Sequence, residues 1–192
     1  TSTNKIDVNN IFSTNRLGLS DTFEAGRSLT LGFDFLSEKK NTLDNINDFF
    51  EFKLATVLRD KEENFISNQS TLNKKNSNIF GSINKKFSEN MNLKYNFSID
   101  NDYSTFEYND LNASFSINNV ITNFNFIKET NDIGNTNVLK TSVSYNPDNR
   151  NSFSFSTRRN RKINLTEYYD LVYEYKNDCL IAGIKYNKTY YS

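Results

Sequence analysis

The feature that most constrains this chain is a strict alternation of apolar and polar residues. It is clearest between Met91 and Asp100, where the sequence reads MNLKYNFSID. Successive side chains of a β-strand point to opposite faces, so a period of two places the apolar set on one face and the polar set on the other. No comparable helical period appears along the chain. The sequence therefore predicts an all-β protein.

The same alternation returns in about ten segments, most of them about 8–12 residues long. Transmembrane strands need about 9–11 residues at their tilt, whereas soluble strands most often have about 5–6. The lengths therefore favour strands that cross a membrane. The expected strands are, roughly, 27–36, 48–58, 78–87, 91–100, 105–117, 120–128, 137–145, 151–158, 167–175 and 179–190.

The links between these strands differ in length at the two ends of the expected sheet. One end receives the short links 88–90, 118–119, 146–149 and 176–178, and the other receives 59–77, 101–104, 129–136 and 159–166. The link 37–47 is an exception, because it is long on the short side. Outer-membrane barrels have short periplasmic turns and longer extracellular loops. We therefore expect residues 1–192 to be a single portion of an antiparallel, up-and-down transmembrane β-barrel, incomplete and cut from a longer chain.

Composition agrees with a sheet that is apolar on one face. The apolar fraction is 36%, low for a packed soluble core, yet 15% of the residues are aromatic, which argues against disorder. No run of about 18 apolar residues is present, so a transmembrane helix is excluded. With 23 basic and 23 acidic residues, no overall charge favours nucleic acid.

The residue inventory also argues against catalysis. The chain has no histidine and one cysteine, which removes the usual general base and the commonest zinc ligand sets. No glycine-rich phosphate loop, nucleophile elbow or metal-ligand spacing is present. We expect no enzyme activity, no catalytic or metal-binding residues and no cofactor.

Two positions depart from the regular pattern, and one alternative fold shares it. Lys85 stands at a position of its strand that should point to the apolar face. A charge on that face is tolerable near a membrane interface but costly at the midplane. The parity slips between Tyr108 and Leu111, which predicts a bulge near Asn109 and Asp110. A soluble, secreted β-sandwich that acts as a binding module would also alternate, and it is distinguished by two apolar faces pressed together.

Two segments resemble LptD, the family that assembles lipopolysaccharide in the outer membrane. Residues 10–24 resemble the family's "LFSxNRFSGxDR" region, and the matching positions are Phe12, Ser13, Asn15, Arg16 and Asp21. Residues 173–186 resemble a late-barrel hairpin of the family, with Cys179 where some members have two adjacent cysteines. Hairpins between the two segments fit by pattern alone. Another porin-like outer-membrane barrel is the alternative within the membrane class.

The resemblance implies a function and a set of partners. These are lipopolysaccharide carried toward the outer leaflet of the bacterial outer membrane, a plug lipoprotein like LptE, the periplasmic bridge proteins of the Lpt system, and outer-membrane lipid. It also implies a disulfide from Cys179 to a cysteine outside this chain. A structural interpretation of Cys179 as a small buried apolar residue stands beside it.

Each remaining group of candidate residues has a functional and a structural interpretation. Asn92, Lys94, Asn96 and Ser98 are expected to face the barrel lumen, so Phe97→Arg should block assembly where Asn96→Arg is tolerated. Asn15, Arg16 and Asp21 are either loop residues in which Arg and Asp satisfy each other, or part of a segment that packs in the lumen or against strands. The basic cluster contacts lipopolysaccharide phosphates or is merely solvated, and comprises Arg158, Arg159, Arg161 and Lys162.

Overall fold

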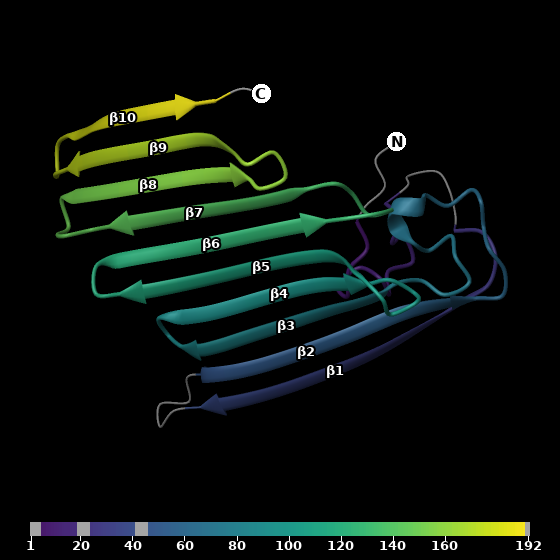
Figure 1. The fold of residues 1–192 in the computed structure, drawn as a ribbon. Helices are drawn as coiled ribbons and strands as arrows, with labels where there is room; N and C mark the ends of the chain where they lie inside the picture. Colours follow the sequence, from purple (N-terminus) through teal and green to yellow (C-terminus); the bar gives the residue numbers. More distant parts are fainter. Residues whose placement is uncertain (1–4, 19–23, 41–45, 191–192) are drawn as a thin grey trace.

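The computed structural model describes residues 5–18, 24–40 and 46–190 of the chain. Ten strands form one antiparallel sheet in which every strand pairs with its neighbours in sequence (Figure 1). The predicted all-β, up-and-down fold is therefore confirmed. The strands are β1 (Ser28–Lys40), β2 (Ile46–Arg59), β3 (Ile79–Ser88), β4 (Met91–Ile99), β5 (Phe106–Ile117), β6 (Val120–Glu129), β7 (Asn137–Tyr145), β8 (Asn151–Asn160), β9 (Leu165–Lys176) and β10 (Ile181–Thr189).

The observed strands begin and end within a few residues of the predicted ones. The largest difference is in β1, which was expected to end at residue 36 and continues to Lys40. Its last residues are polar, but Glu38 and Lys39 pair with Phe49 and Asp48 of β2. Backbone pairing therefore extends the ladder beyond the point where the apolar alternation ends.

The predicted bulge near Asn109 and Asp110 is misplaced. Tyr108 pairs with Ser98 and Phe106 pairs with Ile99, which leaves Glu107 as the additional residue. Its side chain is only 4% exposed. Glu107 accepts hydrogen bonds from Asn78 Nδ2 at 2.6 Å and Asn131 Nδ2 at 2.9 Å. The irregularity lies at the residue whose carboxylate is bound by two loops, not at the following polar pair.

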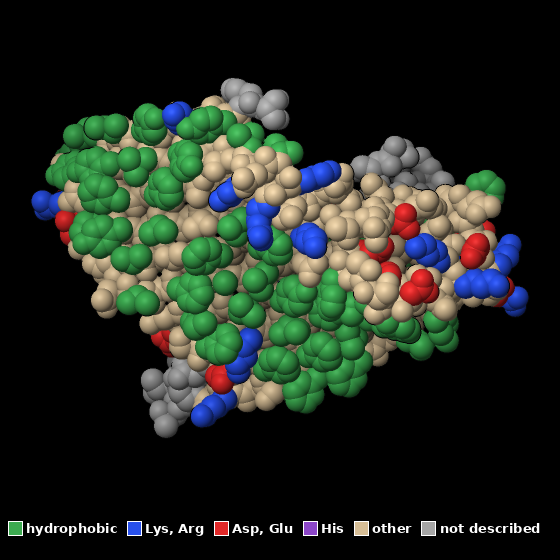
Figure 2. Space-filling model, viewed as in Figure 1, with side chains coloured by type: hydrophobic (Ala, Val, Ile, Leu, Met, Phe, Trp, Pro, Cys, Tyr) green, Lys and Arg blue, Asp and Glu red, His purple; other side chains and the backbone are tan. Residues whose placement is uncertain are grey.

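The two faces of the sheet differ in chemistry, as the alternation predicts. We call the face that carries Leu31, Phe52, Phe97, Phe124 and Leu171 the apolar face, and the opposite one the polar face. Figure 2 shows hydrophobic side chains spread over the strands of the apolar face. Aromatic rings meet there across strands, because cross-strand neighbours on one face lie close together. The ring centroids of Phe115 and Phe124 are 6.0 Å apart.

The apolar face is not packed against a second sheet in the described part of the chain. All ten strands belong to one sheet, and large apolar side chains remain open to the surroundings. Phe33 is 57% exposed, Leu171 49% and Ile184 73%. This arrangement differs from a β-sandwich, in which two apolar faces press together.

The sheet is open at both edges within the described residues. β1 pairs with β2 alone, and β10 pairs with β9 alone. A barrel has no such edges, because its first and last strands pair with each other. The sheet therefore has the form of an incomplete barrel. No helix of the described residues is long and apolar enough to span a membrane.

The links alternate between the two ends of the sheet, which we call the turn end and the loop end. The turn end carries the links after β3, β5, β7 and β9, and the loop end those after β2, β4, β6 and β8. Asn118 takes the left-handed conformation in the turn after β5, with φ of 51°, a geometry that asparagine tolerates better than most residues. The loop end includes a single 3-10 turn, Asn68–Ser70. The link 41–45 lies outside the described residues.

A small buried core lies at the loop end, on the polar face of β1–β3. We call residues 5–18 the cover segment, because it lies over the sheet there. Its apolar side chains join Ala55, Val57 and Phe80 of the sheet and two loop residues in one cluster, which comprises Ile6, Val8, Ile11, Leu17, Ala55, Val57, Ile66, Leu72 and Phe80. Packing against strands was one of the two interpretations open for this segment, but the apolar residues that form the cluster did not follow from the sequence pattern.

Candidate functional site

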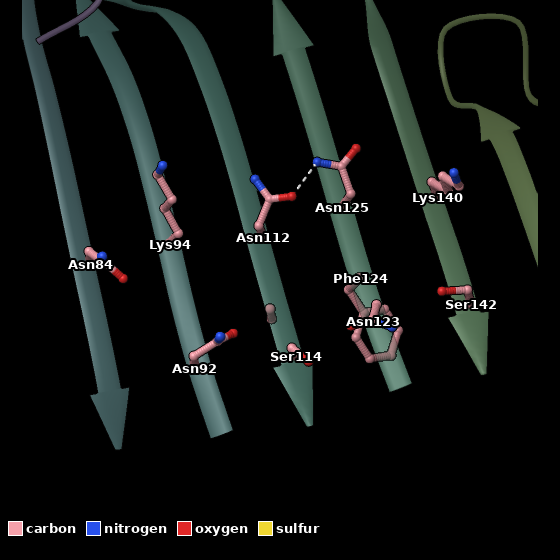
Figure 3. A pocket seen from close by; sticks show the side chains of 11 residues that line it. Asn84, Asn92, Lys94, Asn112, Ser114, Asn123, Phe124, Asn125, Lys140 and Ser142 are labelled. Atoms are coloured by element: carbon pink, nitrogen blue, oxygen red, sulfur yellow. Dashed lines mark hydrogen bonds between the residues drawn. The ribbon is translucent and has the colours of Figure 1, made fainter. Parts of the chain in front are cut away.

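An open hollow lies on the polar face of the sheet, away from the cover segment. It has a volume of about 450 Å³ and lies across β3–β7 (Figure 3). Its polar lining comes mainly from amide and ammonium side chains: Asn84, Asn92, Lys94, Asn112, Asn125 and Lys140. The alternation positions all of them, because every second residue of each strand points to this face.

A hydrogen-bonded ladder of polar side chains runs beside and into this hollow. Ser82 donates to Asn96 Oδ1 at 2.9 Å, and Asn96 Nδ2 lies 3.4 Å from Asp110 Oδ2. The other oxygen of Asp110 accepts from Asn112 Nδ2 at 2.8 Å and Asn125 Nδ2 at 3.1 Å. The ladder crosses four strands, β3–β6, so it holds this polar surface in one arrangement.

Asn112 and Asn125 also bond to each other at the centre of the hollow. Asn125 Nδ2 donates to Asn112 Oδ1 at 2.7 Å (Figure 3). Amide groups present both donors and acceptors, so the pair still offers hydrogen-bonding capacity to a ligand. A surface of this kind suits a hydroxyl-rich molecule.

Two lysines flank the amide pair and have no acidic partner among the residues that the structure describes. Lys94 on β4 and Lys140 on β7 lie on either side of Asn112 and Asn125 (Figure 3). Two other lysines of the polar face are paired: Lys53 Nζ lies 2.7 Å from Glu51 and Lys185 Nζ 3.3 Å from Asp170. The hollow therefore carries two ammonium groups, and Asp110 of the neighbouring ladder is bound by amides.

The four residues predicted to face the lumen all lie on the polar face, but in different surroundings. Asn92 and Lys94 line the hollow, and Asn96 belongs to the hydrogen-bonded ladder. Ser98 is 1% exposed at the loop end and accepts a hydrogen bond from Asn78 Nδ2 at 3.1 Å. Of the four, only Asn92 and Lys94 border the hollow itself. The sequence analysis did not single out Lys140, although its parity on β7 was the available signal.

The residues of the first family motif lie in the cover segment. Phe12 is 58% exposed, yet its ring lies over Gly32, where an added Cβ would be 2.4 Å from Phe12 Cζ. Asn15 is exposed and accepts the backbone N–H of Gly18 at 3.1 Å, as a turn residue. Asp21 lies outside the described residues.

Arg16 is the buried anchor of the cover segment, at 6% exposure. Its Nε donates to Glu24 Oε2 at 2.5 Å, and its other nitrogens bond to Ile11 O, Thr30 Oγ1 and Ser28 Oγ at 3.1, 2.9 and 3.1 Å. Burial lowers the pKa of the Arg16 guanidinium. The acidic partner that the structure gives Arg16 is Glu24, and two further bonds attach it to β1.

Glu24 also binds Arg59, so one carboxylate joins two buried guanidinium groups. Arg59 is 7% exposed, forms an ion pair with Glu24 and donates to Ala25 O at 2.8 Å. Glu63, also 7% exposed, lies close enough that a Cβ on Gly26 would be 2.5 Å from its Oε1. Sequence reasoning missed this network, since no local pattern connects residues 24, 59 and 63.

The basic cluster at the end of β8 is divided between the two faces. Arg158 lies on the polar-face parity and pairs with Glu167, with Nε 3.1 Å from Oε2. Arg159 lies on the apolar-face parity and donates to Asn164. Arg161 lies over the ring of Phe126, with its Cζ 5.4 Å from the centroid. Lys162 is exposed in the turn. The four residues therefore do not form one site.

Lys85 and Cys179 both lie near the turn end. Lys85, on the apolar-face parity, is neutralised by Asp48, with Nζ 2.5 Å from Oδ1. Cys179 is exposed in the turn after β9, and its backbone N–H donates to Asn177 Oδ1 at 3.0 Å. The thiol is thus accessible rather than packed as a small apolar residue.

The side chains that line the hollow are chiefly amides, hydroxyls and lysines. Within the described ranges, no group of three or more His, Cys, Asp or Glu side chains could hold a metal ion. Neither the scan against protein-family models nor the search of curated proteins found a match to this chain. What the chain does must therefore be argued from its two faces and from its two motif segments.

Proposed function

We propose that this chain forms part of the wall of an outer-membrane β-barrel. The observation that carries the proposal is the apolar face, on which side chains such as Phe33, Leu171 and Ile184 are about half exposed or more. Soluble monomers rarely leave contiguous apolar patches larger than a few hundred Å². Strand lengths from 9 to 14 residues also suit a membrane-spanning strand. In this proposal the apolar face contacts lipid.

The polar face would then line a hydrated interior. Barrel strands alternate apolar residues toward lipid with polar residues toward the lumen. The ladder from Ser82 to Asn125 and the hollow beside it supply that polar lining. The cover segment lies on the same face, so it would fill part of the interior at the loop end. The open edges of β1 and β10 leave room for further strands.

We further propose that lipopolysaccharide is the molecule guided by this interior. The support is the resemblance of residues 10–24 and 173–186 to LptD, together with the chemistry of the hollow. Its amides can bond sugar hydroxyls, and Lys94 and Lys140 can pair with phosphates. In this scheme an LptE-like plug and the periplasmic Lpt bridge are the partners, and the exposed Cys179 pairs with a cysteine elsewhere.

The wall proposal is tested by placing an arginine on each face of one strand. Phe155 is 38% exposed on the apolar face, and its neighbour Ser154 points to the polar face. In lipid, Phe155→Arg should cost about 2–4 kcal/mol if it lies near the midplane. Loss of the heat-modifiable, membrane-assembled form for Phe155→Arg, but not for Ser154→Arg, is the expected result. Phe97→Arg is a weaker test, because Phe97 is only 9% exposed and packs against neighbouring rings. An arginine there would disturb that packing whether the face contacts lipid or water.

Equal assembly of the Phe155 and Ser154 variants would contradict the lipid-facing assignment. In a sheet that faces water on both sides, an arginine in place of a half-exposed phenylalanine disrupts nothing. Recovery of the unaltered protein as a soluble monomer without detergent would contradict it as well.

The proposal that lipopolysaccharide passes through the interior is tested by photo-crosslinking from the centre of the hollow. A crosslinking residue at Asn112 should capture newly made lipopolysaccharide during a short pulse and lose the adduct during a chase. The same residue at Leu171 on the apolar face should show no such transient adduct. Absence of a chase-sensitive adduct at Asn112, in a protein that assembles normally, would contradict the transport of lipopolysaccharide. A porin-like barrel would then be the remaining proposal.

A further inference from the structure

The loop end of the apolar face carries three basic side chains around two apolar ones. Lys128 at the end of β6, Arg159 at the end of β8 and Arg161 just after β8 are all exposed. They surround Phe126 on β6 and Leu139 on β7, which are cross-strand partners. On the face shown in Figure 2, Lys and Arg side chains gather where β6, β7 and β8 reach the loop end. We call these three cations the basic rim.

The strand register fixes the three cations on one face. Arg159 pairs across the strands with Leu139, and Lys128 pairs with Asn137. The backbone N–H of Arg161 donates to Asn137 O at 2.8 Å, which places Arg161 beside the same point. Its guanidinium lies over the Phe126 ring, with Cζ 5.4 Å from the centroid. A cation held over an aromatic ring stays on that face.

The basic rim has no anionic partner among the residues that the structure describes. Each nearby carboxylate is bound by another cation. Glu129 pairs with Lys5, Glu167 with Arg158, and Asp132 with Lys74. Arg159 has a neutral partner, Asn164. Three positive charges are therefore left uncompensated at the edge of an apolar surface.

The turn end of the same face is arranged differently. Lys85 lies on the apolar-face parity there, but Asp48 neutralises it with an Nζ–Oδ1 distance of 2.5 Å. The apolar face thus has compensated charge at one rim and excess positive charge at the other. The asymmetry indicates an anionic partner at the loop-end rim alone.

We propose that the basic rim binds the phosphate of a membrane lipid whose acyl chains lie along Phe126 and Leu139. The inference rests on the proposed function, because it needs the apolar face to contact lipid. Guanidinium groups bind phosphate through paired N–H donors, and a lysine adds a point charge. Free phosphate could satisfy the charges, but it would leave the adjoining rings uncovered. The rim is distinct from the hollow, which lies on the opposite face.

The test compares two double variants that remove the same charge from different places. Arg159→Gln with Arg161→Gln alters the basic rim, and Arg150→Gln with Lys176→Gln removes two exposed cations at the turn end, outside both the rim and the hollow. The intact protein in zwitterionic detergent is titrated with phosphatidylglycerol, and native mass spectrometry counts the lipids retained. Each removed cation should weaken retention by about fivefold, so the rim variant should bind about twenty-five-fold more weakly. The turn-end variant should retain lipid like the unaltered protein.

Equal lipid retention by the two double variants would overturn the inference. Displacement of the lipid by inorganic phosphate at matched concentration would also overturn it, since it would show a general anion site. Failure of the proposed function looks different, because the unaltered protein would then not insert into phosphatidylcholine vesicles at all. Insertion without preference for the anionic lipid defeats the rim proposal alone.

Discussion

The polar face of β1–β3 and the polar face of β4–β7 have the same strand geometry but opposite surroundings. Near the loop end of β2, the positions that point to this face are Ala55 and Val57, at 3% and 0% exposure under the cover segment. On β4 and β5 the corresponding parity carries Asn96 and Asn112 in an open hydrogen-bonded ladder. At Ala55 and Val57, apolar residues on the polar face coincide with the place where another segment covers the sheet.

The two regions also compensate charge in different ways. Beside the cover segment, Glu24 binds the buried guanidinium groups of Arg16 and Arg59, and its own side chain is largely shielded from water. In the open region, Lys94 and Lys140 have no acidic partner in the described part of the chain and rely on water. A buried guanidinium requires a partner, whereas an exposed ammonium does not. The covered region is thus the part of the molecule most sensitive to the loss of one charge.

Removal of the shared carboxylate should have the largest effect. Glu24→Gln would remove the carboxylate that pairs with both Arg16 and Arg59, and loss of one partner from a buried pair costs about 3–5 kcal/mol. Denaturant unfolding and protease cleavage of the cover segment would measure the loss. Glu62→Gln is the control, since Glu62 is exposed in the same region. Similar midpoints for the two variants would show that the cover is not held by this network.

Alanine substitutions at two glycines that lie beneath aromatic rings should have smaller effects on stability. They compare the covered region with the open one directly. A Cβ on Gly81 would be 2.1 Å from Phe97 Cζ, and Phe97 is held between Tyr95 and Phe106, with centroids 5.4 and 5.8 Å away. Gly81→Ala should therefore cost about 1–3 kcal/mol, because the ring has no free space to move into.

Gly32→Ala is the matched change in the covered region. Its Cβ would be 2.4 Å from Phe12 Cζ, but Phe12 is 58% exposed and can swing away. Thermal unfolding of the two alanine variants should rank Gly81 as the more damaging site. The reverse order would show that Phe12 fixes the cover segment more firmly than its exposure indicates.

The smallest effect is expected from acid at the turn after β7, in the open region. Hydrogen bonds from the Asn151 side chain, and then from the backbone N–H groups of Arg150 and Asn151, lower the pKa of Asp148 from its ordinary value of 3.8. The carboxylate therefore stabilises this turn fully above that value, and the contribution is lost as pH falls through the lowered pKa.

Backbone amide NMR shifts of Arg150 and Asn151 would follow this titration. Their midpoint should lie below 3.8, and Asp148→Asn should abolish the transition. A midpoint at or above the ordinary value would mean that the turn hydrogen bonds do not persist in solution.

The sequence predicted the parts of the fold that depend on local periodicity. All ten strands and the division into two faces followed from alternation, because side-chain direction in a strand depends only on parity. For the same reason the sequence predicted that Asn92, Lys94 and Asn96 share one face, which is the polar face of the sheet. The alternation predicts which face a side chain points to but not how deeply it is buried. The burial of Ser98 could therefore not be predicted.

Features that join distant residues were missed or misplaced. The ion pairs of Glu24 with Arg16 and Arg59 form because the N-terminal segment folds back on the sheet. The periodicity of the sequence does not predict such a long-range contact. The bulge was expected next to Leu111, where the parity slip is visible, but the extra residue is Glu107. The side chains of the loop residues Asn78 and Asn131 donate hydrogen bonds to the Glu107 carboxylate, and these bonds favour the bulge at Glu107.

The pairing of each strand with its neighbours in sequence has a consequence for assembly. Every ladder closes through the link between two consecutive strands, so the sheet can grow by one hairpin at a time from either end. Contacts of this kind are short in sequence and carry a small loop-closure cost. At each stage the newest strand leaves a row of unpaired backbone groups, which serves as the template for the next one.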